Sequence, residues 1–228
     1  MKINKKILGL GAAFLTSALL SVTASAGGGG DCNVRTESAF GSVFYIPSGG
    51  TGSYNVLGWG NGTASTVGQY DGMLESVAEQ CILIAAATTT NSGSGAAVED
   101  SVNAALSRYS NIINSNPTVC TSGHSQGGGG SFNSANRLNA DCVIAVQPDT
   151  VFTTSIFRPV SSSTDVVCIF SFGDTLAPAL PSNSLNCRLN STRYSEEIVS
   201  GTHFAPYSGT GGDVGAEMRD YAQRWLVD

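Results

Sequence analysis

Gly123-His124-Ser125-Gln126-Gly127 follows directly on the strand-like run 118–121. The GxSxG pattern is typical of a sharp strand-to-helix turn that lifts one serine hydroxyl out of the end of a sheet. Glycines suit this turn, because the backbone takes unusual angles there and the strand and helix come too close for a β-carbon beside the serine. A chance match in a Gly-Ser-rich loop is the competing interpretation, since the chain holds 28 glycines. The remaining sequence has to decide between the two.

Strand-like and helix-like segments alternate along the rest of the chain. Residues 42–46 and 54–59 are β-rich and flank a Pro-Ser-Gly segment, so we predict a hairpin at one end of a sheet. Elsewhere apolar spacing predicts helices over 70–80, 96–114, 126–137 and 214–226, and strands over 81–86, 118–121, 142–146, 166–172 and 194–199. Wholly apolar strands that alternate with helices indicate an α/β protein with a mostly parallel central sheet and helices on both faces.

Ser125 and His203 form the first part of a candidate catalytic site. A serine hydroxyl is a poor nucleophile until a base takes its proton. The chain holds two histidines. His124 adjoins the serine in a tight turn, so we expect it to point away from the hydroxyl and to support the loop. His203 follows a predicted strand, and we therefore expect it to be the base.

Asp174 is the candidate acid that would hold the base in its tautomer. It follows the predicted strand 166–172, and ligands of parallel sheets gather at the carboxyl ends of strands. Asp149, after the preceding strand, is the competitor; we favour Asp174 because a loop there reaches the far side of the histidine. Asp165 precedes its strand and lies at the wrong end of the sheet. In proteins with a GxSxG nucleophile turn, the acid and then the histidine follow the serine along the chain, and Ser125, Asp174 and His203 occur in this order.

Two backbone N–H groups usually stabilise the oxyanion of an acyl-transfer reaction. Gln126, directly after the candidate nucleophile, is expected to supply one. The glycine-rich segment Gly58-Trp59-Gly60-Asn61-Gly62-Thr63 allows a close backbone approach, and Thr63 is our choice for the other. A dinucleotide-binding loop is the alternative for this segment, but it has neither a GxGxxG helix start nor an acidic residue at the right distance.

Residues 1–26 are expected to be a secretory signal peptide, with three lysines, an apolar stretch and the cleavage motif Ala24-Ser25-Ala26. Residues 27–30 read as a flexible glycine leader, and 31–228 as a single domain. Cleavage would remove three of the 11 basic residues and none of the 17 acidic ones, so the formal net charge would change from −6 to −9. Such a charge opposes binding to nucleic acid and to anionic membranes.

Six cysteines remain after the predicted cleavage, an even number that indicates disulfides in an exported protein. We predict the pairs Cys32–Cys81 and Cys168–Cys187. Cys120 and Cys142 lie in apolar runs and are left open as buried free thiols. A zinc site is disfavoured because the sequence has no CxxC pair, and no cofactor is implied.

Three motifs in this order resemble those of the cutinase and polyethylene-terephthalate hydrolase branch of the α/β-hydrolase superfamily. They are Gly123-His124-Ser125-Gln126-Gly127-Gly128-Gly129-Gly130, similar to GHSMGGGG; Asp174-Thr175-Leu176-Ala177-Pro178, similar to DTIAP; and His203-Phe204-Ala205-Pro206, similar to HFAPN. The resemblance runs from about Tyr54 to the final helix. It implies an α/β-hydrolase catalytic domain over 31–228 without a lid domain, acting as a serine esterase on short esters and, as a further substrate class, polyesters.

The chain departs from these relatives around the expected acyl site. Thr63, Gln126 and Asp149 stand where the family places an aromatic residue, a methionine and a tryptophan. We therefore expect a more polar wall and favour ester hydrolysis over the hydrolysis of aromatic polyesters. Trp59, Asp149 and Phe204 are the candidate substrate-binding residues.

A secreted binding protein that keeps the fold without catalysis is the alternative function. In either case we expect a secreted or periplasmic monomer without a stable membrane anchor, whose partner is a small molecule rather than nucleic acid.

Overall fold

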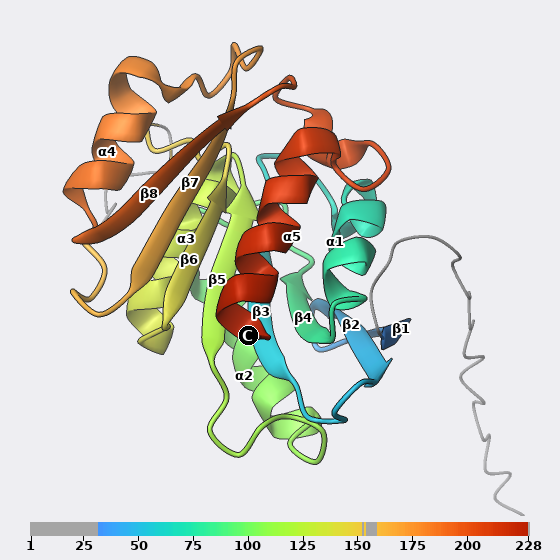
Figure 1. Cartoon of the computed structure of the whole chain (residues 1–228). Helices are drawn as coiled ribbons and strands as arrows, with labels where there is room; N and C mark the ends of the chain where they lie inside the picture. The colour runs from blue at the N-terminus through green and yellow to red at the C-terminus, as the bar shows by residue number, and fades with distance from the viewer. Residues whose placement is uncertain (1–31, 152, 154–158, 228) are drawn as a thin grey trace, which may run out of the picture.

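The apolar segments of the sequence form the inner strands of one eight-stranded sheet (Figure 1). The computed structural model describes residues 32–151, 153 and 159–227, so the predicted signal peptide and glycine leader lie outside the described residues. The strands are β1 (Cys32–Ala39), β2 (Ser42–Gly49), β3 (Asn55–Gly60), β4 (Ile82–Ala87), β5 (Val119–His124), β6 (Cys142–Val146), β7 (Asp165–Ser171) and β8 (Arg193–Val199). Their order across the sheet is β1-β2-β4-β3-β5-β6-β7-β8.

Helices cover both faces of the sheet, as predicted from the alternation (Figure 1). The described helices are α1 (Asp71–Ala78), α2 (Ala96–Arg108), α3 (Gln126–Leu138), α4 (Ser184–Leu189) and α5 (Gly212–Leu226), with short helical turns η1 (Val67–Gln69), η2 (Ala179–Asn183) and η3 (Ala205–Tyr207). Helices α1 and α5 pack on one face, and α2 and α3 on the other. Within the described part, none of the helices combines the length and the apolar composition needed to cross a bilayer.

From β4 to β8 the strands are parallel, which confirms the mixed α/β architecture with a mostly parallel sheet. The predicted hairpin of 42–46 with 54–59 is wrong, because β4 lies between β2 and β3. The residues of β3 are almost all buried because β3 is an inner strand, which pairs with β4 on one side and with β5 on the other. The actual hairpin joins β2 to the polar edge strand β1, which the sequence pattern did not reveal.

The predicted helix 96–114 also ends early, at Arg108. Beyond it the chain turns so that Ile112 and Asn114 can pair with Tyr54 through main-chain hydrogen bonds of 2.9 and 3.0 Å. Backbone pairing ahead of β3 therefore replaces the last turns of the helix. Helix α4 was not predicted, because six residues are too few for a periodic pattern.

Three disulfides join the six cysteines among the described residues. The pairs Cys32–Cys81 and Cys168–Cys187 are confirmed. Cys120 and Cys142 are not free thiols: they are direct neighbours on the parallel strands β5 and β6, with Cα atoms 4.5 Å apart, and form the third bond. Only the register of the two strands brings these cysteines together.

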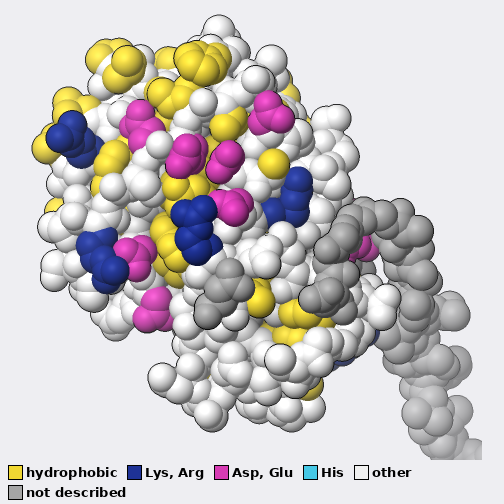
Figure 2. Space-filling view, viewed as in Figure 1, with side chains coloured by type: hydrophobic (Ala, Val, Ile, Leu, Met, Phe, Trp, Pro, Cys, Tyr) yellow, Lys and Arg dark blue, Asp and Glu magenta, His cyan; other side chains and the backbone are white. Residues whose placement is uncertain are grey.

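Charged side chains of both signs are interspersed over the face that α5 covers (Figure 2). Arg224 pairs with Asp220 on α5, and Arg193 of β8 pairs with Asp165 at the start of β7 with a separation of 2.8 Å. Asp165 therefore lies at the amino end of its strand, as expected, and serves an ion pair there. This face consequently offers no continuous basic surface to a polyanion.

Close packing of β3, β5 and α3 determines the turn between β5 and α3. Gly60 pairs with Gly123 in the sheet, and a β-carbon on Gly127 would collide with the carbonyl group of Gly60. A β-carbon on Gly123 would collide with the carbonyl group of Gly127. The helix can start directly against the strands only because these positions are glycine.

Gly127→Ala should therefore lower the free energy of unfolding by about 2–3 kcal/mol, because the added methyl overpacks rigid backbone. Urea unfolding of the oxidised protein measures the change. Gly68→Ala is the matched control, since its β-carbon would meet its nearest neighbour at 3.7 Å, an ordinary contact. Equal stability of the two variants would contradict this account of the turn.

Candidate active site

Ser125, Asp174 and His203 lie at the carboxyl edge of the sheet. They follow β5, β7 and β8, respectively, whose parallel directions bring these ends together. Ser125 and His203 line one pocket of about 390 Å³. The pocket is lined by Gly62, Thr63, Ser125, Asp149, Leu176, His203, Phe204 and Tyr207.

Ser125 occupies the turn between β5 and α3 in a strained conformation, with φ 54° and ψ −117°. A non-glycine residue takes such angles only where its surroundings hold it. Its backbone N–H donates to Val146 O at 3.1 Å, and its carbonyl accepts from the N–H groups of Gly129 and Asp149 at 3.0 and 2.9 Å. These bonds fix the serine to β6, to α3 and to the loop after β6.

Asp174 and His203 form a buried pair. His203 Nδ1 lies 2.8 Å from Asp174 Oδ2, while Asp174 Oδ1 accepts from the N–H groups of Leu176 and Ala177 at 2.9 and 2.8 Å. Burial raises the pKa of the Asp174 carboxyl, but the hydrogen bonds from His203 and from the backbone outweigh it and leave the pKa below its ordinary value. An ionised Asp174 keeps the proton of His203 on Nδ1, so that Nε2 is the basic nitrogen. Asp174, rather than Asp149, is thus the partner of the histidine.

His124 supports the loop of the candidate base, as its position in the turn predicted. It is fully buried, and its Nε2 lies 2.9 Å from the carbonyl oxygen of His203. A carbonyl only accepts, so Nε2 carries the proton. Burial, reinforced by repulsion from His203, lowers the pKa of His124 to about 3, and the ring is neutral near pH 7. Nδ1 is therefore an acceptor.

Tyr70 links this histidine to the loop after β3. Its hydroxyl lies 2.9 Å from His124 Nδ1, to which it donates, and it accepts the N–H of Gly62 at 3.0 Å. Gln147 adds a second support, because its Nε2 donates to Thr202 O at 2.8 Å. Buried side chains thus hold the backbone of the histidine loop at two successive carbonyls.

Of the two backbone N–H groups predicted to stabilise an oxyanion, that of Thr63 belongs to a residue that lines the pocket, whereas Gln126 is not one of the lining residues. The Gly62 N–H is occupied by Tyr70, and those of Ala64 and Ser65 donate to Thr90 O and Gly62 O. The Thr63 N–H has no hydrogen-bond partner among the described residues, and Thr63 lines the pocket. Gln126 is the first residue of α3, where an N–H has no acceptor within the helix.

Of the predicted substrate-binding residues, Asp149 and Phe204 line the pocket, and Trp59 does not contact it. Trp59 is fully buried in the core, edge-on to Tyr70, with Nε1 donating to Asn61 Oδ1 at 3.2 Å. The alternation of β3 turns this side chain towards the face that α1 and α5 cover, so the prediction for Trp59 is wrong.

Gln126 is not part of the polar pocket wall that the sequence predicted. Its side-chain oxygen accepts the Ser92 N–H at 3.1 Å and so ties α3 to the loop after β4. The other two residues of that predicted wall, Thr63 and Asp149, do line the pocket.

Sequence reasoning missed Leu176, Tyr207 and Tyr70. Leu176 lies two residues after Asp174, and Tyr207 lies four after His203 on η3, so proximity to the two motifs was an available signal for both. Tyr70 is distant from every motif, and only the fold places its hydroxyl beside His124.

Among the described residues, no group of histidine, cysteine, aspartate or glutamate side chains is arranged to hold a metal ion. No protein-family model matches this chain, and no curated protein sequence is significantly similar to it.

The burial of neutral His124 predicts a loss of stability in acid. The unfolded histidine titrates near pH 6.5 and the folded one near 3, so the stabilisation is complete above pH 6.5 and is lost as the pH falls below it. Between pH 7 and 5 this amounts to about 2 kcal/mol. Urea unfolding at pH 7 and pH 5 measures the change. The free energy of unfolding of His124→Gln should fall by about 2 kcal/mol less over this range than that of the native protein, whereas equal changes in the two proteins would refute the assignment.

Proposed function

We propose that this protein is a secreted serine hydrolase that cleaves carboxylic esters through an acyl-enzyme intermediate. The observation that carries the proposal is the meeting, in one pocket, of Ser125 in its strained turn with the Asp174–His203 pair. The Thr63 N–H supports it, because a donor that has no partner among the described residues and lines the same pocket as the serine suits a developing oxyanion.

Acylation begins when Ser125 Oγ attacks the ester carbonyl carbon and His203 Nε2 takes the hydroxyl proton. The negative charge moves to the carbonyl oxygen, which accepts hydrogen bonds from the N–H groups of Thr63 and Gln126. Collapse of the intermediate breaks the bond to the alcohol oxygen, and His203 gives its proton to that oxygen. The alcohol leaves, and the acyl group remains on Ser125.

Deacylation repeats the sequence with water as nucleophile. His203 Nε2 removes a proton from the water as its oxygen attacks the acyl carbon. Collapse of this second intermediate breaks the bond between the acyl carbon and Ser125 Oγ, which takes the proton from His203 as the carboxylic acid leaves. Asp174 stays ionised throughout and stabilises the imidazolium that forms in each half-reaction. The reaction needs no cofactor.

The proposal includes an α/β-hydrolase fold of the cutinase and polyester hydrolase type. It is supported by the strand-turn-helix around Ser125, by the chain order serine, aspartate, histidine, and by the positions of these residues after β5, β7 and β8. Three disulfides favour an oxidising compartment outside the cytoplasm. The carboxylate of Asp149 in the pocket wall favours esters over aromatic polyesters as substrates.

Ser125→Ala tests the proposal directly. The native protein should hydrolyse p-nitrophenyl acetate and butyrate and be labelled stoichiometrically by a fluorophosphonate. Ser125→Ala should lose the labelling and at least about 10³-fold in kcat, because Ser125 is the one serine among the described residues that line the pocket. Asp174→Asn should lose about 10²- to 10⁴-fold through the wrong tautomer of His203.

Ser38→Ala, an exposed serine of the edge strand β1, is the control that should behave as the native protein. Complete inertness of the oxidised native protein towards activated esters and the fluorophosphonate would instead favour the binding-protein alternative.

A further inference from the structure

A second cavity adjoins the pocket that contains Ser125. It has a volume of about 160 Å³, is open to solvent, and shares Asp149 and Leu176 with the first pocket. Its other walls are mostly apolar: Val151, Pro178, Leu180 and Pro181. The two cavities are therefore neighbouring compartments, and Asp149 and Leu176 form the boundary between them.

The apolar side chains around this second cavity are unusually exposed. Leu180 is 71%, Leu176 58% and Val151 56% exposed. Contiguous exposed apolar surface of this kind is typical of a site that a ligand covers. Because the surface opens beside Ser125, the substrate of the proposed reaction is the occupant that its position favours.

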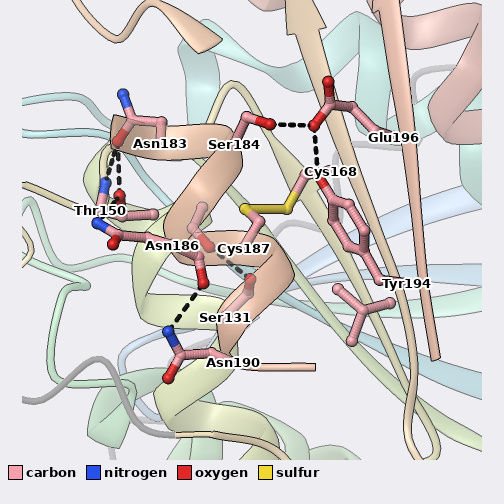
Figure 3. The surroundings of a disulfide bond; sticks show 12 residues. Ser131, Thr150, Cys168, Asn183, Ser184, Asn186, Cys187, Asn190, Tyr194 and Glu196 are labelled. Carbon is pink, nitrogen blue, oxygen red and sulfur yellow. Dashed lines mark hydrogen bonds between the residues drawn. A yellow bond between two sulfur atoms is a disulfide. The ribbon is translucent and has the colours of Figure 1, made fainter. Parts of the chain in front are cut away.

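Buried hydrogen bonds between Asn183 and Thr150 hold the wall of the second cavity in place (Figure 3). Asn183 is 4% exposed. Its Oδ1 accepts from the backbone N–H and the hydroxyl of Thr150 at 2.8 and 2.6 Å, and its Nδ2 donates to Pro178 O at 2.9 Å. One side chain thereby joins the loop after β6 to the loop after β7, and these two loops supply the walls of the cavity.

The disulfide Cys168–Cys187 adds a covalent bond that holds α4 in place next to these loops (Figure 3). It ties α4 to the buried strand β7, and Asn186 of the same helix donates to Thr150 Oγ1 at 2.9 Å. The cavity is therefore formed before any ligand arrives, as binding pockets usually are.

We propose that the second cavity is a binding subsite for the acyl arm of the ester, and that it selects an uncharged apolar arm of about six carbons. The inference rests on the proposed function. The departing alcohol must lie beside His203, which protonates it. His203 lines the first pocket with Phe204 and Tyr207, whereas the second is reached past Asp149 and Leu176, so the acyl arm is the part of the substrate that points there.

The size and chemistry of the cavity set the class of arm. A cavity of about 150 Å³ holds a benzene molecule, so about six carbons fill one of 160 Å³. An arm that ends in a carboxylate is rejected, because the apolar wall does not replace the water that the charge loses. Each buried methylene should raise kcat/KM by about threefold until the cavity is full.

The test compares two series of esters on the native protein. Among p-nitrophenyl esters, kcat/KM should rise by about 30- to 100-fold from acetate to hexanoate, and the mono-p-nitrophenyl ester of adipic acid should be at least about tenfold poorer than the hexanoate. Methyl and hexyl acetate, which lengthen the alcohol instead, should differ by less than about threefold, because that arm lies outside the cavity.

Leu180→Gln places a polar side chain in the cavity wall and is the decisive variant. It should lower the ratio of kcat/KM for the hexanoate to kcat/KM for the acetate by about five- to tenfold. Leu189→Gln is the matched control: Leu189 is 69% exposed and belongs to the end of α4 rather than to the cavity wall. It should leave both esters unchanged.

Acetate and hexanoate of equal kcat/KM, equal losses in the two leucine variants, or a gain from the longer alcohol rather than the longer acyl arm would each overturn the subsite. In those cases the acetate is still hydrolysed, and the proposed esterase stands. A native protein inactive towards every ester refutes the esterase and the subsite together.

Discussion

The close approach of β3, β5 and α3 is the constraint on which the rest of the site depends. It is possible because Gly60, Gly123 and Gly127 leave no β-carbons between the three backbones. As a result α3 begins immediately after the strand, and Ser125 is held at φ 54° with its hydroxyl at the carboxyl edge of the sheet. The N–H of Gln126, which has no acceptor within α3, is placed by the same geometry. The proposed nucleophile and one proposed oxyanion donor therefore both depend on one packing requirement.

Beneath the pocket, buried polar side chains turn the histidine loop and the loop after β3 into fixed parts of the site. Tyr70 and His124 connect Gly62 to the carbonyl of His203, and Gln147 holds the preceding carbonyl. Burying such groups is unfavourable unless their hydrogen bonds are made. The connection fixes the backbone of His203 and occupies the N–H of Gly62, so that in this loop the proposed oxyanion donor is Thr63.

The segment after β7 combines two roles. It carries Asp174 at its start and Asn183 at its end, and between them Leu176, Pro178 and Leu180 line the cavity beside the serine. The backbone N–H groups that Asp174 binds belong to this segment, and Asn183 joins it to the loop of Asp149. Orientation of the base and the shape of the proposed acyl subsite thus depend on the same stretch of chain, which the disulfide Cys168–Cys187 anchors through α4.

The sequence by itself determined the features that depend on local pattern: the turn around Ser125, the inner strands, and the choice of Asp174 and His203 from their places after strands. Tertiary structure alone decided the neighbours. It inserted β4 between β2 and β3, paired Cys120 with Cys142, buried Trp59 and turned the side chain of Gln126 towards Ser92. Periodicity shows which residues are buried and which lie near strand ends, but strand order and register determine which distant residues meet, and these are settled by the packing of the whole sheet.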